Sequence, residues 1–163
     1  MPVSGSGFSG DIQIINDSPF RLDVLDLLEQ HLAEMLATSP PESVHTLDPN
    51  ALGGPSITFF TAREDGVLLG CGALSALGGS EGEVKSMRTT PRARGRGVAT
   101  LLLERILDEA RTQGFSAVSL ETGVEQYFSA ARSLYARLGF TECAPFASYT
   151  DDPNSVYFRI DLA

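Results

Sequence analysis

The sequence has few cysteines and no long apolar run. Cys71 and Cys143 show neither the spacing of metal ligands nor the pattern of a disulfide framework, and both stand among apolar residues, where a buried free thiol is usual. No apolar stretch approaches the roughly 20 residues that a membrane span needs. Residues 1–10 lack the basic and apolar regions of a signal peptide. We therefore expect a cytoplasmic protein with no metal and no membrane segment, whose residues 1–10 form a flexible tail.

Basic residues are scarce but concentrated. The chain has 12 Lys and Arg against 21 Asp and Glu, a net charge of −9, which argues against the broad basic surface that binds nucleic acid. No Asp or Glu occurs between Glu83 and Glu104. Five basic residues fall within positions 85–96, namely Lys85, Arg88, Arg92, Arg94 and Arg96. A basic island on an acidic protein suits a small polyanion that is bound at one place.

The same island carries a glycine-rich segment, Arg92-Ala93-Arg94-Gly95-Arg96-Gly97-Val98-Ala99. Glycine adopts positive φ and lets the backbone approach a ligand closely. An apolar helix is predicted to begin near Val98, and the N–H groups of a helix N-terminus form an anion site. Arginine adds charge and forked donors. The segment therefore predicts a binding site for the pyrophosphate of a phosphorylated cofactor.

The sequence predicts one mixed α/β domain over residues 11–163. Apolar and β-branched runs predict strands, and apolar residues at helical spacing predict helices. The expected strands are 12–15, 57–61, 67–77, 83–90, 117–120, 140–146 and 156–162, and the expected helices are 19–38, 98–113 and 128–138. Asp65-Gly66 predicts a hairpin within an antiparallel meander, and the later strand–helix–strand unit implies a right-handed parallel crossover. Residues 38–55 are expected to form a long loop.

Two other phosphate-binding motifs fit less well. Gly95-x-Gly97-x-x-Thr100 is similar to a dinucleotide fingerprint, with Glu121 at the end of the next strand. Its third position is Thr rather than Gly or Ala, and too little chain follows for a doubly wound sheet. A P-loop requires a Gly-Lys-Ser/Thr ending, which this sequence lacks.

Two motifs together resemble the GCN5-related N-acetyltransferase (GNAT) superfamily. Arg92-x-x-Gly95-x-Gly97 matches its acyl-CoA signature, and Ala131-Arg132-Ser133-Leu134-Tyr135-Ala136-Arg137-Leu138-Gly139-Phe140 matches its A-x-x-L-Y-x-x-x-G-F helix end. The resemblance implies an acyl-CoA N-acyltransferase fold of mixed α/β class. Its central sheet is mostly antiparallel, splayed at the cofactor site and flanked by helices.

The resemblance also implies acetyl-CoA as the co-substrate. The glycine-rich segment would wrap its pyrophosphate, and the strand before it would bond the pantetheine arm, with the Met87 N–H polarising the thioester carbonyl. The residues expected to bind the cofactor are Met87, Arg88, Thr89, Arg92, Arg94, Gly95, Arg96, Gly97, Val98 and Ala99. Many family members carry an asparagine that contacts pantetheine where this chain has Phe128.

Catalytic roles follow from the same resemblance. Tyr135 stands where the family places a tyrosine that protonates the departing CoA thiolate, and a phenol with a pKa near ~10 is protonated at neutral pH. Glu83 resembles the family's carboxylate base, which often acts through water, and Glu121 is the second candidate. His31 is expected to be a surface or packing histidine, whereas His45 lies in the long loop without a motif around it.

These expectations combine into a function. The chain would transfer an acetyl group from acetyl-CoA directly to a primary amine of a small molecule, with no covalent enzyme intermediate. Alternatives are another acyl donor, an oxygen acceptor, a protein N-terminus or lysine as acceptor, and an acyl-CoA sensor without turnover. Residues 38–55 and 147–154 are expected to recognise the acceptor, and Arg88 could face an acceptor carboxylate. A homodimer is an expectation from the resemblance alone.

Overall fold

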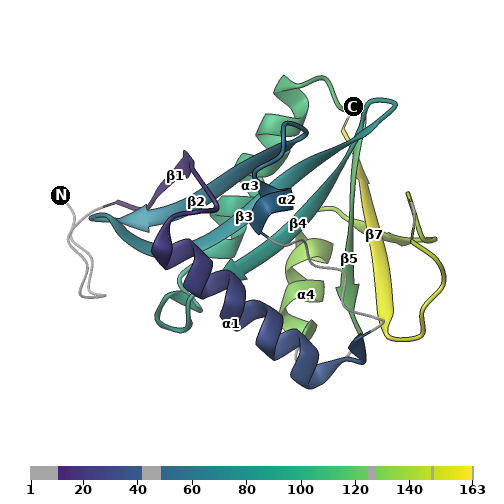
Figure 1. Ribbon diagram of the computed structural model, residues 1–163. Coiled ribbons are helices and arrows are strands. Elements are labelled where there is room, and N and C mark those ends of the chain that lie inside the picture. Colours follow the sequence, from purple (N-terminus) through teal and green to yellow (C-terminus); the bar gives the residue numbers. More distant parts are fainter. Residues whose placement is uncertain (1–10, 42–48, 125–127, 148, 163) are drawn as a thin grey trace.

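A seven-stranded mixed sheet forms the centre of the molecule, with its strands in the order β1-β2-β3-β4-β5-β7-β6 (Figure 1). The computed structural model describes residues 11–41, 49–124, 128–147 and 149–162. The strands are β1 (Gln13–Asn16), β2 (Ile57–Glu64), β3 (Val67–Gly78), β4 (Glu81–Thr89), β5 (Ala117–Gly123), β6 (Thr141–Cys143) and β7 (Ser155–Asp161). The helices are α1 (Leu22–Thr38), α2 (Pro49–Leu52), α3 (Val98–Thr112) and α4 (Ser129–Arg137), with a 3-10 turn at Pro91–Ala93.

Two tight hairpins build the antiparallel half of the sheet. Asp65 and Gly66 connect β2 to β3 with φ values of 53° and 80°, and Gly79 and Ser80 connect β3 to β4 with φ values of 63° and 66°. Two consecutive residues with positive φ match the right-handed twist of the strands that they join. The predicted meander is therefore confirmed, as is the parallel crossover, because β4 and β5 pair in parallel through α3.

The pairing of β4 with β5 is short. It covers only Glu81–Glu83 of β4 against Ala117–Ser119 of β5. Beyond this point β4 stays paired with β3 as far as Thr89, while β5 stays paired with β7 as far as Gly123. The two strands therefore separate along their second halves, which confirms the splayed sheet that the family resemblance implied.

An irregularity in β4 marks the point of separation. The register between β3 and β4 shifts between Cys71 and Ala73, and Ser86 adopts a φ of 57° within the strand. The Cys71 thiol donates to the Ser86 carbonyl oxygen at 3.4 Å. Gly72 faces the bulge, and a Cβ there would lie 2.6 Å from the Met87 sulfur. The bulge turns the backbone of β4 away from a regular ladder.

Helices cover both faces of the sheet (Figure 1). One core cluster joins α1 and α2 to the sheet through residues that include Val24, Leu52 and Phe59. A larger cluster joins α3 and α4 to the opposite face and includes Ile106 and Leu134. The parallel crossover thus places the helix that follows the glycine-rich segment against the sheet.

Some predicted boundaries are wrong. Helix α1 begins at Leu22 rather than at position 19, because Asp17 is bound to β2 through the Thr61 hydroxyl at 2.6 Å and Ser18 forms a turn by accepting from the Phe20 N–H at 3.1 Å. The strand predicted at 140–146 is only Thr141–Cys143, since Pro145 has no N–H to continue the ladder. The long loop contains α2. The predicted tail at residues 1–10, and His45, lie outside the described residues.

Candidate functional site

A cleft of about 560 Å³ opens where β4 and β5 separate, and we call it the loop cleft. The strand β4, the glycine-rich segment, the first turn of α3 and helix α4 form its walls. Its lining residues are His31, Met87, Arg88, Thr89, Ala93, Arg94, Gly95, Gly97, Val98, Ala99, Thr100, Phe128, Ala130, Ala131, Leu134, Tyr135 and Arg137. All of the predicted cofactor residues except Arg92 and Arg96 are in this lining.

The backbone of the glycine-rich segment faces this cleft. Gly95 and Gly97 both have φ values of 80°, and a Cβ added to either would meet no atom within 4 Å. Glycine is needed there for its conformation, because an L-residue at that φ is strained. Gly97 immediately precedes α3, whose Leu101 N–H donates to the Gly97 carbonyl at 3.1 Å. The amides before Leu101 belong to the unpaired first turn of a helix, which attracts anions.

The arginines of the segment have different surroundings. Arg94 is exposed and lines the loop cleft, whereas Arg92 is exposed on the loop outside it. Arg96 turns back to the sheet and pairs with the buried Glu64 of β2 at 3.0 Å. Arg88 is buried and forms an ion pair with Glu34 of α1. The side chain of Arg96 therefore fixes the loop to β2 rather than lining the cleft.

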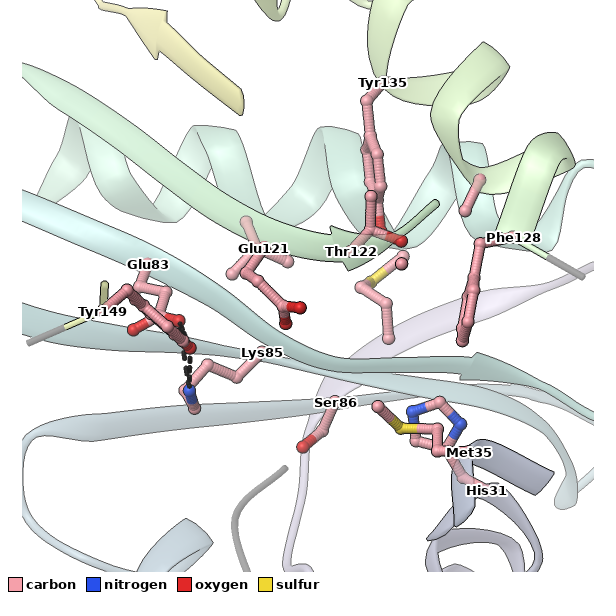
Figure 2. A pocket seen from close by; sticks show the side chains of 14 residues that line it. His31, Met35, Glu83, Lys85, Ser86, Glu121, Thr122, Phe128, Tyr135 and Tyr149 are labelled. Carbon is pink, nitrogen blue, oxygen red and sulfur yellow. Dashed lines mark hydrogen bonds and ion pairs between the residues drawn. The ribbon is translucent and has the colours of Figure 1, made fainter. Parts of the chain in front are cut away.

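A second, smaller space of about 100 Å³ adjoins the first on the side of β5, and we call it the carboxylate cavity (Figure 2). Its lining residues are His31, Met35, Glu83, Val84, Lys85, Ser86, Met87, Glu121, Thr122, Gly123, Phe128, Ala131, Tyr135 and Tyr149. The two spaces share His31, Met87, Phe128, Ala131 and Tyr135. Residues from α1, β4, β5, α4 and the segment before β7 therefore meet at one place.

Glu83 lies in a polar cluster at one side of the carboxylate cavity. Its Oε2 accepts from the Tyr149 hydroxyl at 2.6 Å and from Lys85 Nζ at 3.0 Å, and Lys85 also donates to the Tyr149 oxygen at 3.0 Å. Glu83 is 5% exposed. Burial, together with the Glu83 charge, raises the pKa of Tyr149. The negative charge of Glu83 is thus compensated by a lysine and a hydroxyl.

Glu121 and Tyr135 also line the carboxylate cavity. The Glu121 Oε2 accepts from the Ser155 hydroxyl at 2.7 Å, and its carboxylate points into the cavity in Figure 2. Tyr135 is 7% exposed, and its ring packs on Phe140 and Phe158 with centroids 5.8 and 6.1 Å away. Burial, and secondarily the Glu121 charge, raises the pKa of Tyr135 to about 12. The phenol is therefore protonated at neutral pH.

The sequence predicted a surface or packing histidine at position 31; His31 is half-buried and lines both spaces where they meet. His31 belongs to helix α1, which brings it to the gap between β4 and β5. Burial, and then the Arg88 charge, lowers the pKa of His31 to about 4. The imidazole is therefore neutral near pH 7. Sequence reasoning missed it because no motif surrounds it, although its one-helical-turn spacing from Met35 places both on one face of α1.

The cysteines do not provide a nucleophile near neutral pH. Cys71 is fully buried, and burial raises the pKa of its thiol to about 12, although the nearby Arg88 opposes the shift. Burial also raises the pKa of Cys143.

The described residues contain no group of three or more His, Cys, Asp or Glu side chains that could hold a metal ion. Within the same ranges, no helix has the length and apolar character to cross a membrane.

The low pKa of His31 predicts a pH dependence of stability. The unfolded chain binds a proton at this residue below about pH 6.5, whereas the folded chain does not until about pH 4. Stability that His31 contributes is therefore present above pH 6.5 and is lost as the pH falls toward 4. We expect His31→Gln to reduce the pH dependence of the free energy of unfolding, measured by urea denaturation between pH 6.5 and 4. The slope should fall by up to about 1.4 kcal/mol per pH unit, the value for one proton. Equal slopes for the two proteins would contradict the shifted pKa.

The sequence is similar to a known protein family and to several of its members. The family model described as Acetyltransferase (GNAT) family matches residues 24–140. The N-acetyltransferase YsnE of Bacillus subtilis is 48% identical over 139 residues, which cover 85% of this chain and 92% of the relative. A protein of Azospirillum brasilense named IAA acetyltransferase is 41% identical over 153 residues, which cover 93% of this chain and 99% of the relative.

Solved structures agree in fold. A protein from Klebsiella pneumoniae, provisionally named an acyl-CoA N-acyltransferase, superposes with a TM-score of 0.76 at 27% identity, covering 93% of this chain and 98% of the other. A Bacillus subtilis acetyltransferase in complex with CoA has a TM-score of 0.69 at 17% identity, covering 94% of this chain and all of the other. The fold and the extent of the sequence matches agree on one family. The chain belongs to the GNAT acetyltransferases and is an N-acetyltransferase.

Proposed function

We propose that the protein transfers an acetyl group from acetyl-CoA directly to the amine of a small molecule, in a complex that holds both at once. The observation that carries this proposal is the meeting of the two spaces at Tyr135. The loop cleft has anion-binding features, and the carboxylate cavity has acidic groups. The thioester of a cofactor bound in the loop cleft would lie next to an amine bound in the carboxylate cavity, so the amine could attack it. Proximity of this kind supplies much of the acceleration of a two-substrate reaction.

The loop cleft fits acetyl-CoA in several respects. The first turn of α3 and Gly95 offer backbone donors for the pyrophosphate, and Arg94 adds positive charge beside them. The apolar residues Phe128, Ala131 and Leu134 suit the pantetheine arm. The gap between β4 and β5 leaves strand backbone free of a β-ladder partner on that side. The likeness to an acetyltransferase solved with CoA supports the same ligand.

The reaction requires two proton transfers. The uncharged amine nitrogen attacks the thioester carbon, a C–N bond forms, and the C–S bond then breaks to release CoA as a thiolate. We assign stabilisation of the carbonyl oxygen to the Met87 N–H, beside the β4 bulge. We assign protonation of the thiolate to Tyr135, whose phenol carries its proton at neutral pH. The amine proton must pass to a carboxylate, directly or through water.

Glu121 is better suited than Glu83 to take that proton. The Glu83 Oε2 already accepts from Lys85 Nζ and from the Tyr149 hydroxyl, so this oxygen is occupied by two donors. Glu121 accepts from the uncharged Ser155 and influences the pKa of Tyr135, which is consistent with a place near the reacting groups. We therefore propose Glu121 as the base and Glu83 as an anchor for Lys85 and Tyr149.

A small acceptor is favoured over a protein. The carboxylate cavity has a volume of about 100 Å³ and is bounded by Phe128, Met35 and Tyr149. The name of the Azospirillum relative also indicates a small molecule. An acyl-CoA sensor without turnover would not require a protonated phenol and a carboxylate at the meeting point. Binding of acetyl-CoA without CoA release from any amine would favour the sensor.

Tyr135→Phe tests the proposed acid. We expect amine-dependent CoA release to fall by about 10² or more, while calorimetry gives an unchanged affinity for acetyl-CoA. Tyr157→Phe is the matched control, because Tyr157 is also buried but lines neither space and donates to the Thr150 carbonyl. An unchanged rate in Tyr135→Phe would remove Tyr135 from the mechanism.

Glu121→Gln and Glu83→Gln together identify the base. We expect Glu121→Gln to lower kcat/KM by about 10²-fold or more. Glu83→Gln should lower kcat/KM far less, because the Glu83 carboxylate is already paired with Lys85. The opposite ranking of the two variants would assign the base to Glu83.

A further inference from the structure

Two buried polar atoms of the carboxylate cavity are not explained by the proposed chemistry. They are Nδ1 of His31 and Oγ of Ser86, and neither has a hydrogen-bond partner among the residues that the structure describes. His31 comes from α1 and Ser86 from the bulge of β4, and both side chains line the cavity. Figure 2 shows Ser86 and His31 on the side of the view away from Tyr135.

Leaving such atoms unpaired is costly. A buried donor or acceptor without a partner destabilises the folded state by about 1–3 kcal/mol. Ser86 also holds a φ of 57°, a conformation that glycine would adopt without strain. A polar group of a bound ligand would pair both atoms.

The chemistry of the two groups limits what they bind. A serine hydroxyl offers one donor, and a neutral imidazole offers one donor and one acceptor. Both can donate to one oxygen group, while neither supplies a positive charge. The charged residues around them are Lys85 and Arg88 against Glu34, Glu83 and Glu121, and the two cations form ion pairs with Glu83 and Glu34. Glu121, which accepts from the Ser155 hydroxyl, also supplies negative charge that suits an ammonium or amine, whereas His31 and Ser86 supply donors that suit an oxygen.

We propose that His31 and Ser86 form a subsite for an oxygen group of the acceptor, so that the substrate is an amine carrying a hydroxyl or a carboxylate rather than a plain alkylamine. This inference rests on the proposed function. The amine end lies toward Glu121 and Tyr135, and the oxygen end toward His31 and Ser86. The subsite thereby orients the acceptor with its nitrogen toward the loop cleft.

The test compares kcat/KM for matched amines of three and five carbons that end in methyl, hydroxymethyl or carboxylate. The wild-type enzyme should prefer an oxygen-bearing amine over its alkyl counterpart. Ser86→Ala and His31→Phe should each reduce that preference, the ratio of kcat/KM for the oxygen-bearing amine to kcat/KM for the alkylamine, by about 3- to 10-fold, the value of one hydrogen bond. Whether the hydroxyl or the carboxylate series shows the preference identifies the oxygen group.

Thr90→Val is the matched control. The Thr90 Oγ1 is likewise buried without a partner among the described residues, but it lines neither space. Thr90→Val should leave the substrate preference unchanged. Ser86→Gly removes the same hydroxyl while relieving the positive φ, so it gives the result of Ser86→Ala in a protein that folds at least as well.

Four outcomes would overturn the subsite. No preference in the wild type, or the same preference in all variants, would exclude an oxygen subsite at these residues. A weaker affinity of the variants for acetyl-CoA would assign them to the cofactor instead. CoA release from none of the amines, despite acetyl-CoA binding, would contradict the proposed function itself and the subsite with it.

Discussion

The site depends on the short parallel ladder between β4 and β5. Three residue pairs hold the two strands together, after which each continues with its other neighbour. Had the ladder continued, the backbone of β4 up to Thr89 would have been paired and no cleft would exist between β4 and β5. The bulge at Ser86 contributes to this separation, because it redirects β4 near the point where the two strands part. The loop cleft and the carboxylate cavity are consequences of this separation.

Positive and negative charge lie at different ends of the site. Two of the cations near it are already matched, Lys85 by Glu83 and Arg96 by Glu64. The backbone of the glycine-rich segment supplies partial positive charge at the start of α3, with Arg94 beside it. The proposed division of labour follows: the loop cleft takes the anionic cofactor, and Glu121 takes the proton of the acceptor.

Much of this architecture was predictable from local patterns. Asp65-Gly66 and the glycines at 95 and 97 have short-range signatures, since their positive φ values come from the chain itself. The family motifs predicted the splayed sheet and the position of Tyr135. The contacts of Glu83 were not predictable, because Tyr149 lies 66 residues away and reaches it only through the tertiary fold. For the same reason, nothing local revealed that Arg96 turns to Glu64 or that α1 brings His31 into the site.

An NMR titration of amide-labelled protein with CoA tests the central claim most directly. If the separation of β4 from β5 forms the cofactor site, the largest shifts will come from Met87–Thr89, Gly95 and Gly97–Thr100, which line the loop cleft. Amides at the far side of the carboxylate cavity, such as that of Ser155, will move little. Largest shifts on α2 or the outer strand β1 at saturating CoA would contradict the account.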